Sequence, residues 1–298
     1  MNLTGLGIWT AQFDFQPAAV VRDTVQELEA LGYGSIWIGE NVGREPISQA
    51  AILLAATRRM TVATAVANLW ARDPLSMAAA HQTLAEAYAR RFILGLGVSH
   101  PKLVNDTRGL RYERPIHTVR DYLMAMDELV ERYRAVRADE TVRVLAALGP
   151  RMLKLAAEHS DGAHTYLVPP EHTARAREII GPAKILVPEQ AIVLETDKTR
   201  AREIGRRHVR RYLTLPNYTN NLRRLGFTEE DLSHDGSDRL LDALVARGDE
   251  TAIAKRVVQH LEAGADHVCL QVLDADFRGL PLAQWRRLAA IVPAGSRR

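Results

Sequence analysis

Two short apolar runs flank a single helical stretch in the segment 60–100. Met60–Val66 is rich in β-branched residues and contains neither glycine nor proline, which is typical of a buried strand. A helix is expected over Pro74–Ala89, since proline is favoured at the first helical position, and Arg91–Gly97 is the second apolar run. Two strands joined in this way form a βαβ unit, in which the strands are parallel and their carboxyl ends lie on one side.

Polar and aromatic side chains follow both runs at the edge where the carboxyl ends are expected to meet. Asn68, Trp70 and Arg72 follow the first run, and Ser99 and His100 follow the second. In α/β proteins the loops at this edge carry ligand binding and catalysis. We therefore expect the functional site here.

The alternation of strand and helix continues along the whole chain. Each expected strand is followed by a helical stretch, and the strands are placed at Leu3–Trp9, Ser35–Ile38, Met60–Val66, Arg91–Gly97, Arg143–Leu148, Gly162–Val168, Gln190–Glu195 and His267–Leu273. Eight alternating units without a break in composition predict a single α/β domain over residues 1–298, a (β/α)₈ TIM barrel.

Residues 213–247 depart from this alternation. They contain turn signals at Pro216, Gly226 and Gly236 and several short helical stretches, and they precede the last strand. We expect a helical insertion that covers the carboxyl-end face as a lid, with contacts from Tyr218, Asn221 and Phe227.

Charge and cysteine content narrow the class of protein. The 39 basic residues nearly balance the 36 acidic ones, which does not indicate a nucleic-acid partner. Cys269 is the only cysteine, so an intrachain disulfide and a cysteine metal cluster are excluded. His81 and His117 lie within expected helices without a second ligand at metal spacing, so we expect neither to bind a metal. With no signal-like start and no apolar run near the ~20 residues of a membrane span, we expect a cytoplasmic protein without a membrane partner.

Several blocks of the chain resemble the luciferase-like monooxygenase superfamily, and within it the branch that uses coenzyme F420, an 8-hydroxy-5-deazaflavin. The resemblance covers nearly the whole chain and is carried by Leu28–Glu40, Thr64–His100, Ala147–His164 and the insertion. It implies a barrel with the cofactor ring at the carboxyl end, hydride transfer between the cofactor and a small organic substrate, and a homodimer. The alternatives are a flavin mononucleotide (FMN) monooxygenase and a non-catalytic flavin-binding protein.

The resemblance implies a non-prolyl cis peptide bond within Thr64–Val66, in a bulge that backs the cofactor ring. The bond is either Thr64–Ala65 or Ala65–Val66. Gly95-Leu96-Gly97 lacks the third glycine of a dinucleotide fingerprint, and we interpret it as a strand end where the ring or its ribityl chain lies against backbone. Asn68 either bonds the ring or caps its own loop. The expected ring contacts are Thr64, Ala65, Val66, Asn68, Gly97, Val98, Ser99 and His100.

A turn between a strand and a helix is the candidate phosphate site. Leu148-Gly149-Pro150-Arg151 places Gly149 at a helix start, where backbone N–H groups and the helix dipole favour an anion. A plain strand-to-helix turn is the alternative. The resemblance favours a cofactor phosphate held by Ala147, Leu148, Gly149, Pro150 and Arg151, with Leu167 and Val168 as a second wall.

His100 and Glu40 are the candidate catalytic residues. A histidine can exchange a proton near neutral pH, so His100 is either a general acid or base or a hydrogen-bonding partner of the cofactor or a loop. Glu40 follows the second strand, and Asn41 stands where sugar-phosphate dehydrogenases of this group carry histidine. The expected substrate cavity is lined by Trp9, Asn41, Trp70 and Tyr218.

Overall fold

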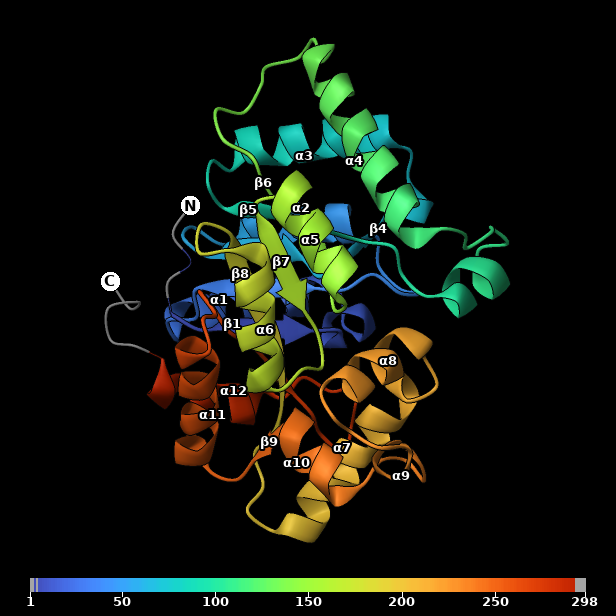
Figure 1. Ribbon diagram of the computed structural model, residues 1–298. Helices are drawn as coiled ribbons and strands as arrows, with labels where there is room; N and C mark the ends of the chain where they lie inside the picture. The colour runs from blue at the N-terminus through green and yellow to red at the C-terminus, as the bar shows by residue number, and fades with distance from the viewer. Residues whose placement is uncertain (1–2, 4, 293–298) are drawn as a thin grey trace.

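A computed structural model describes residue 3 and residues 5–292 (Figure 1). Its core is a closed barrel of parallel strands, which confirms the predicted TIM barrel. The ladder closes because β1 pairs with β10 at Gly7↔Cys269 and β10 pairs with β8 at Leu270↔Gln190. The barrel strands, in their order around the barrel, are β1 (Gly7–Thr10), β2 (Ser35–Ile38), β3 (Thr61–Thr64), β5 (Phe92–Gly97), β6 (Val142–Ala146), β7 (Gly162–Thr165), β8 (Ile185–Val193) and β10 (Cys269–Val272).

Helices cover the outside of the barrel. Pro46, Pro74, Pro150 and Pro170 stand at the start of their helices, where the missing N–H costs no hydrogen bond. The covering helices are α1 (Ala18–Ala30), α2 (Pro46–Ala56), α3 (Pro74–Ala87), α4 (Pro115–Glu131), α5 (Pro150–His159), α6 (Pro170–Ile180), α11 (Glu250–Glu262) and α12 (Leu282–Leu288). Short helical turns lie at η1 (Gln12–Phe15), η2 (Leu69–Ala71), η3 (Lys102–Thr107) and η4 (Ala289–Ile291).

The barrel interior has its own apolar cluster. Trp37 and Val187 are fully buried in it, and Trp9 lies at its upper edge with 9% of its surface exposed. Because strand side chains alternate between the two faces, the residues between these pack outward against the helices. The polar residues that share the inward face of a strand are therefore held inside the barrel or at its mouth.

The helix before the expected insertion packs together with it. The helix α7 (Lys198–Tyr212) packs against α10 and also contacts β8 and β9, whereas α11 packs against α6. We therefore describe α7 together with the expected insertion 213–247. The elements of the insertion are α8 (Pro216–Arg224), α9 (Glu229–Leu232), α10 (Asp238–Leu244) and β9 (Val245–Arg247).

We call residues 198–247 the lid. In Figure 1 the lid helices, yellow to orange, gather on the side of the barrel to which the arrowhead of β7 points. They have a core of their own, which includes Val209, Leu222 and Leu240 and which also takes in Leu167 from the end of β7. The lid is thus joined by apolar packing to the carboxyl-end face.

Some strand ends differ from the predicted ones for local reasons. The first strand starts at Gly7 rather than Leu3, because Gly5 has φ 66° and leaves the extended conformation, and Thr4 lies outside the described residues. The strand β8 starts at Ile185 rather than Gln190. Pro188 is tolerated inside it because it lies where the ladder with β7 ends and the ladder with β10 begins.

Two glycines of β5 make room for the chain segment after β3. A Cβ atom at Gly95 would lie 1.9 Å from the Thr64 carbonyl oxygen, and one at Gly97 would lie 2.4 Å from Val66 Cγ2. Neither position can carry a side chain without moving backbone or a packed residue.

We expect Gly95→Ala to lower the free energy of unfolding by about 3 kcal/mol or more, because a methyl group would overlap backbone that cannot retreat. Urea denaturation measures the change. Gly205→Ala in α7 is the matched control, since its new Cβ would make only ordinary contacts, 3.5 Å from Val245. Equal stability of the two variants would contradict this account of β5.

The part of the chain that the structure describes contains no helix that is both long and apolar enough to span a bilayer.

Candidate functional site

The segment after β3 forms a bulge that neighbouring strands hold in place. The Ala65–Val66 peptide bond is cis, which is one of the two alternatives expected. The Thr64 hydroxyl donates to the Gly95 carbonyl at 2.7 Å, and the Trp9 indole N–H donates to the Ala65 carbonyl at 3.3 Å. Because the Val66 side chain fills the space beside Gly97, that glycine accommodates the bulge. That the cofactor also lies against the Gly97 backbone stays a prediction.

One polar group of the Asn68 side chain is hydrogen-bonded, and the other has no partner among the described residues. Its Oδ1 accepts from the Trp70 backbone N–H at 3.0 Å, which is the loop-capping alternative. Its Nδ2 is buried and has no hydrogen-bond partner among the described residues. A buried donor without a partner is costly, so this amide is available to a ligand.

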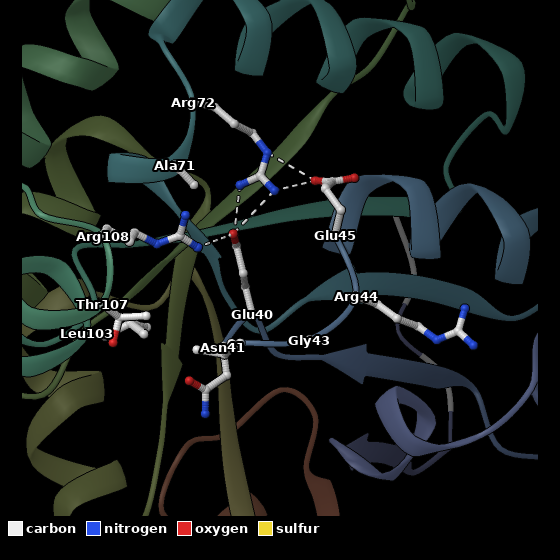
Figure 2. A pocket seen from close by; sticks show the side chains of 11 residues that line it. Glu40, Asn41, Gly43, Arg44, Glu45, Ala71, Arg72, Leu103, Thr107 and Arg108 are labelled. Atoms are coloured by element: carbon white, nitrogen blue, oxygen red, sulfur yellow. Dashed lines mark hydrogen bonds and ion pairs between the residues drawn. The ribbon is translucent and has the colours of Figure 1, made fainter.

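Glu40 is the centre of a charged cluster that joins three loops. Its carboxylate accepts from Arg72 at 2.8 Å, from Arg108 at 2.9 Å and from the Asn68 backbone N–H at 2.7 Å. Arg72 also pairs with Glu45 (Figure 2). Only 5% of the Glu40 side chain is exposed. A carboxylate whose oxygens are both occupied in this way positions loops, so the structure does not support the catalytic role predicted for Glu40.

A cavity of about 510 Å³ lies beside this cluster. In Figure 2 Asn41 lies below Glu40, and Arg44 points away from the Glu40 carboxylate. Trp70, expected in the substrate cavity, is absent from the lining, and its indole N–H donates to the Val98 carbonyl at 3.0 Å. The lining residues are Glu40, Asn41, Val42, Gly43, Arg44, Glu45, Ala71, Arg72, Leu103, Thr107 and Arg108.

His100 follows β5 through Ser99, which has φ 58°. Its Nδ1 is buried without a partner among the described residues, and its ring centroid lies 5.7 Å from that of Tyr218 in α8. Burial lowers the pKa of the imidazole, and a side-chain hydrogen bond with Asn217 opposes that shift. His100 is therefore a neutral imidazole at pH 7 with one free nitrogen at the barrel mouth.

Aromatic rings from the lid and the barrel meet at the mouth. The Tyr166 ring lies 5.1 Å from Trp9 and 5.3 Å from Tyr212, and Tyr218 lies 4.8 Å from Tyr212. The Tyr166 hydroxyl donates to Gln271 at 2.8 Å and lies 2.9 Å from the Tyr212 hydroxyl. Tyr166 thus links Trp9 and Tyr218 in one aromatic cluster, and their place in a substrate cavity stays a prediction.

Sequence reasoning missed Tyr166, Tyr212 and Gln271. Tyr166 lies within the predicted strand Gly162–Val168, and Tyr212 lies just before the expected insertion 213–247. The periodicity of the sequence therefore contained no signal for them.

The turn before α5 has the features of an anion site. Gly149 is the N-cap and contributes no side-chain cap, so the first N–H groups of the helix are not covered by a side chain. The Arg224 guanidinium of the lid lies 3.4 Å from where a Cβ of Gly149 would be. Arg151 and Arg224 are exposed and form no ion pair within the described part of the chain.

The remaining residues of the expected phosphate site contribute less. The Ala147 N–H donates to the His164 carbonyl, and the Leu148 carbonyl accepts from His172 Nε2 at 2.8 Å. The Leu167 N–H donates to Glu189 Oε2 at 2.9 Å, and both Leu167 and Val168 are buried. The expected second wall is therefore not available to a phosphate through the Leu167 amide.

Comparison with known proteins assigns the chain to a family. The model of the luciferase-like monooxygenase family matches residues 5–267. The chain belongs to the luciferase-like monooxygenase family. This match confirms the family resemblance stated from the sequence.

Relatives of this luciferase-like chain include enzymes named for F420. A Mycobacterium tuberculosis protein that bears the name coenzyme F420-dependent oxidoreductase is 31% identical over 172 residues, which is 57% of this chain and 46% of that protein. The match thus spans less than half of this relative. An F420-dependent secondary alcohol dehydrogenase, solved with an F420-acetone adduct, has a TM-score of 0.77 at 15% identity, with 100% of both chains covered.

A second solved structure of the luciferase-like fold carries a flavin. It is the oxygenating constituent of 3,6-diketocamphane monooxygenase of Pseudomonas putida, in complex with FMN. The TM-score is 0.69 at 15% identity, with 99% of this chain and 98% of that chain covered. At this identity the likeness concerns the fold alone.

Proposed function

We propose that this protein is a coenzyme F420-dependent oxidoreductase that transfers a hydride between the deazaflavin and a small organic substrate. The observation that carries the proposal is the uncapped start of α5, which has the Arg224 guanidinium beside Gly149 and Arg151 as the second residue of the helix, both without an ion pair among the described residues. This arrangement suits the phosphate of an anionic cofactor. The names of the F420-dependent relatives support the deazaflavin.

The residues at the barrel mouth fit a flat polar ring. Asn68 Nδ2 and His100 Nδ1 are buried and lack partners among the described residues, so both can bond a ligand. When bound, the deazaflavin supplies or accepts the hydride. Asn68, Gly149, Arg151 and Arg224 would hold the cofactor.

The protein's own contribution is orientation, exclusion of water and movement of a proton. Tyr212 and Tyr218 of the lid pack on the barrel mouth, which keeps water from the reacting atoms. Because His100 is neutral at pH 7, its free Nδ1 can accept the proton of a substrate hydroxyl when the substrate is oxidised. In the reverse direction the same nitrogen must be protonated first.

An FMN-dependent monooxygenase is the second candidate. The FMN complex of a protein of the same fold supports it, and FMN also has a phosphate that the start of α5 could bind. The two cofactors differ in chemistry, since the flavin activates oxygen.

The test is a titration of the purified protein with oxidised F420 and, in parallel, with FMN, followed by tryptophan fluorescence. We expect micromolar binding of F420 and at least tenfold weaker binding of FMN. We also expect Arg151→Ala and Arg224→Ala each to weaken binding by about tenfold, because each removes a charged hydrogen-bond donor.

Lys154→Ala is the matched control for these variants. It also removes one positive charge from α5, but Lys154 points to solvent with 75% of its side chain exposed and pairs with Glu158. Equal losses of cofactor affinity in Arg151→Ala and Lys154→Ala would show that the change in net charge alone accounts for the effect. Tighter binding of FMN would favour the monooxygenase, and binding of neither cofactor would overturn the proposal.

A further inference from the structure

Glu189 is a buried acid that the proposed reaction does not use. It lies in β8 opposite Cys269 of β10, and none of its surface is exposed. Val187, two residues earlier in the same strand, belongs to the cluster inside the barrel. Since strand side chains alternate, Glu189 points into the barrel as well.

The Glu189 carboxyl group is only half satisfied. Oε2 accepts from the Leu167 N–H at 2.9 Å, and Oε1 has no hydrogen-bond partner in the described chain. A buried carboxylate needs several donors or a cation, and neither is supplied here. Burial raises the pKa of Glu189 to about 8, although the bond from Leu167 opposes the shift. The group is therefore uncharged at neutral pH.

The single hydrogen bond of Glu189 fixes the residue through which β7 reaches the lid. Leu167 has φ 55°, a conformation that a leucine adopts only when it is held. Its side chain is 2% exposed and packs in the lid core with Tyr218 and Leu222. Tyr166, which bonds Tyr212, precedes it directly. Movement of Leu167 would therefore disturb both contacts between barrel and lid.

The groups that face Glu189 from neighbouring elements are acids. Burial is the largest cause that raises the pKa of Tyr166 of β7, Tyr212 of α7, Tyr218 of α8 and Cys269 of β10, and a negative charge on Glu189 raises each further. The nearby histidines are uncharged at neutral pH, because burial lowers the pKa of His164 to about 4 and of His208 to about 3. Arg211 acts on Tyr212 and His208, but no cation among the described residues acts on Glu189 itself.

We propose that Glu189 is a positioning residue that holds the β7 exit against the lid, and that it does so as an uncharged acid. Ionisation would place an unpaired charge among three phenols and loosen the lid. This inference goes beyond the proposed function, since it concerns the closure of the lid whichever cofactor is bound.

The first test compares the wild-type protein with Glu189→Gln, whose amide oxygen can still accept from Leu167. The folded pKa lies above the ordinary value of 4.5, so between these values the unfolded chain binds fewer protons and wild-type stability falls as the pH rises. Glu189→Gln lacks this loss. We expect equal melting temperatures near pH 5 and a variant more stable by at least about 5 °C near pH 9.

Glu203→Gln is the matched control, because it removes an exposed glutamate of α7 that has no ion pair among the described residues. Its melting temperature should follow that of the wild type at every pH. Parallel curves for Glu189→Gln and the wild type would overturn the proposal.

The second test needs no cofactor. The near-ultraviolet circular dichroism of the tyrosine cluster should fall in the wild type with a midpoint near pH 8 and persist in Glu189→Gln. Cys269 does not interfere, because burial raises the pKa of its thiol well above the ordinary value. In Glu189→Ala, which cannot accept from Leu167, the signal should be weak at every pH. A signal that stays constant in all three proteins would also overturn the proposal.

Discussion

His100→Gln should lower kcat by about 10²–10⁴-fold and leave the dissociation constant of the cofactor within about threefold. Glutamine keeps a hydrogen-bonding group in the same place but cannot carry a proton. The expectation follows from the free Nδ1 at the barrel mouth, beside Tyr218 of the lid. Stopped-flow measurement of hydride transfer and a separate binding titration distinguish the two parameters.

The pH profile gives this prediction a second readout. Because burial lowers the pKa of His100, the imidazole is in its base form at neutral pH. In the direction of substrate oxidation, kcat should fall as the pH drops through this lowered pKa and stay flat above it. This fall of kcat at low pH should be absent in His100→Gln.

The control is His117→Gln, which replaces an exposed histidine on α4 and should change neither parameter. A loss of cofactor affinity in His100→Gln with kcat retained would assign His100 to cofactor binding. That outcome would leave the proton donor to another group.

The barrel could be predicted because its strands and helices each have a local sequence pattern. The helix predicted to start at Pro74 does begin there, and α5 and α6 likewise begin at Pro150 and Pro170, because proline is favoured at the first helical position. That α7 belongs with the lid could not be predicted, because the segment 198–212 has the same amphipathic pattern as a barrel helix. Its packing against α10 is what groups it with the lid.

The charged and aromatic clusters depend on contacts that no local pattern contains. Glu40 pairs with Arg72 and Arg108, which are 32 and 68 residues away in the sequence. Glu189 lies within an apolar run, and its importance comes from the unpaired Oε1, which only a three-dimensional structure reveals. Sequence reasoning located the carboxyl-end face and several of its residues, but it assigned Glu40 to chemistry rather than to the positioning of loops.

That reassignment of Glu40 leads to the second large effect. Glu40→Gln should lower the free energy of unfolding by about 2–4 kcal/mol, because it leaves two guanidinium groups without their shared anion. The side chains of Arg72 and Arg108 are only 14% and 27% exposed, so water compensates poorly. Urea denaturation measures the loss.

Glu45→Gln is the control that isolates burial. Glu45 pairs with the same Arg72, but 44% of its side chain is exposed, so its loss should cost less than about 1 kcal/mol. The loops that Glu40 joins also carry Asn68, so we expect Glu40→Gln to weaken cofactor binding as well as stability. If Glu40 were instead the proton donor, the variant would keep its stability and its affinity and lose only kcat. The ratio of the two stability losses therefore decides between a residue that builds the site and one that reacts in it.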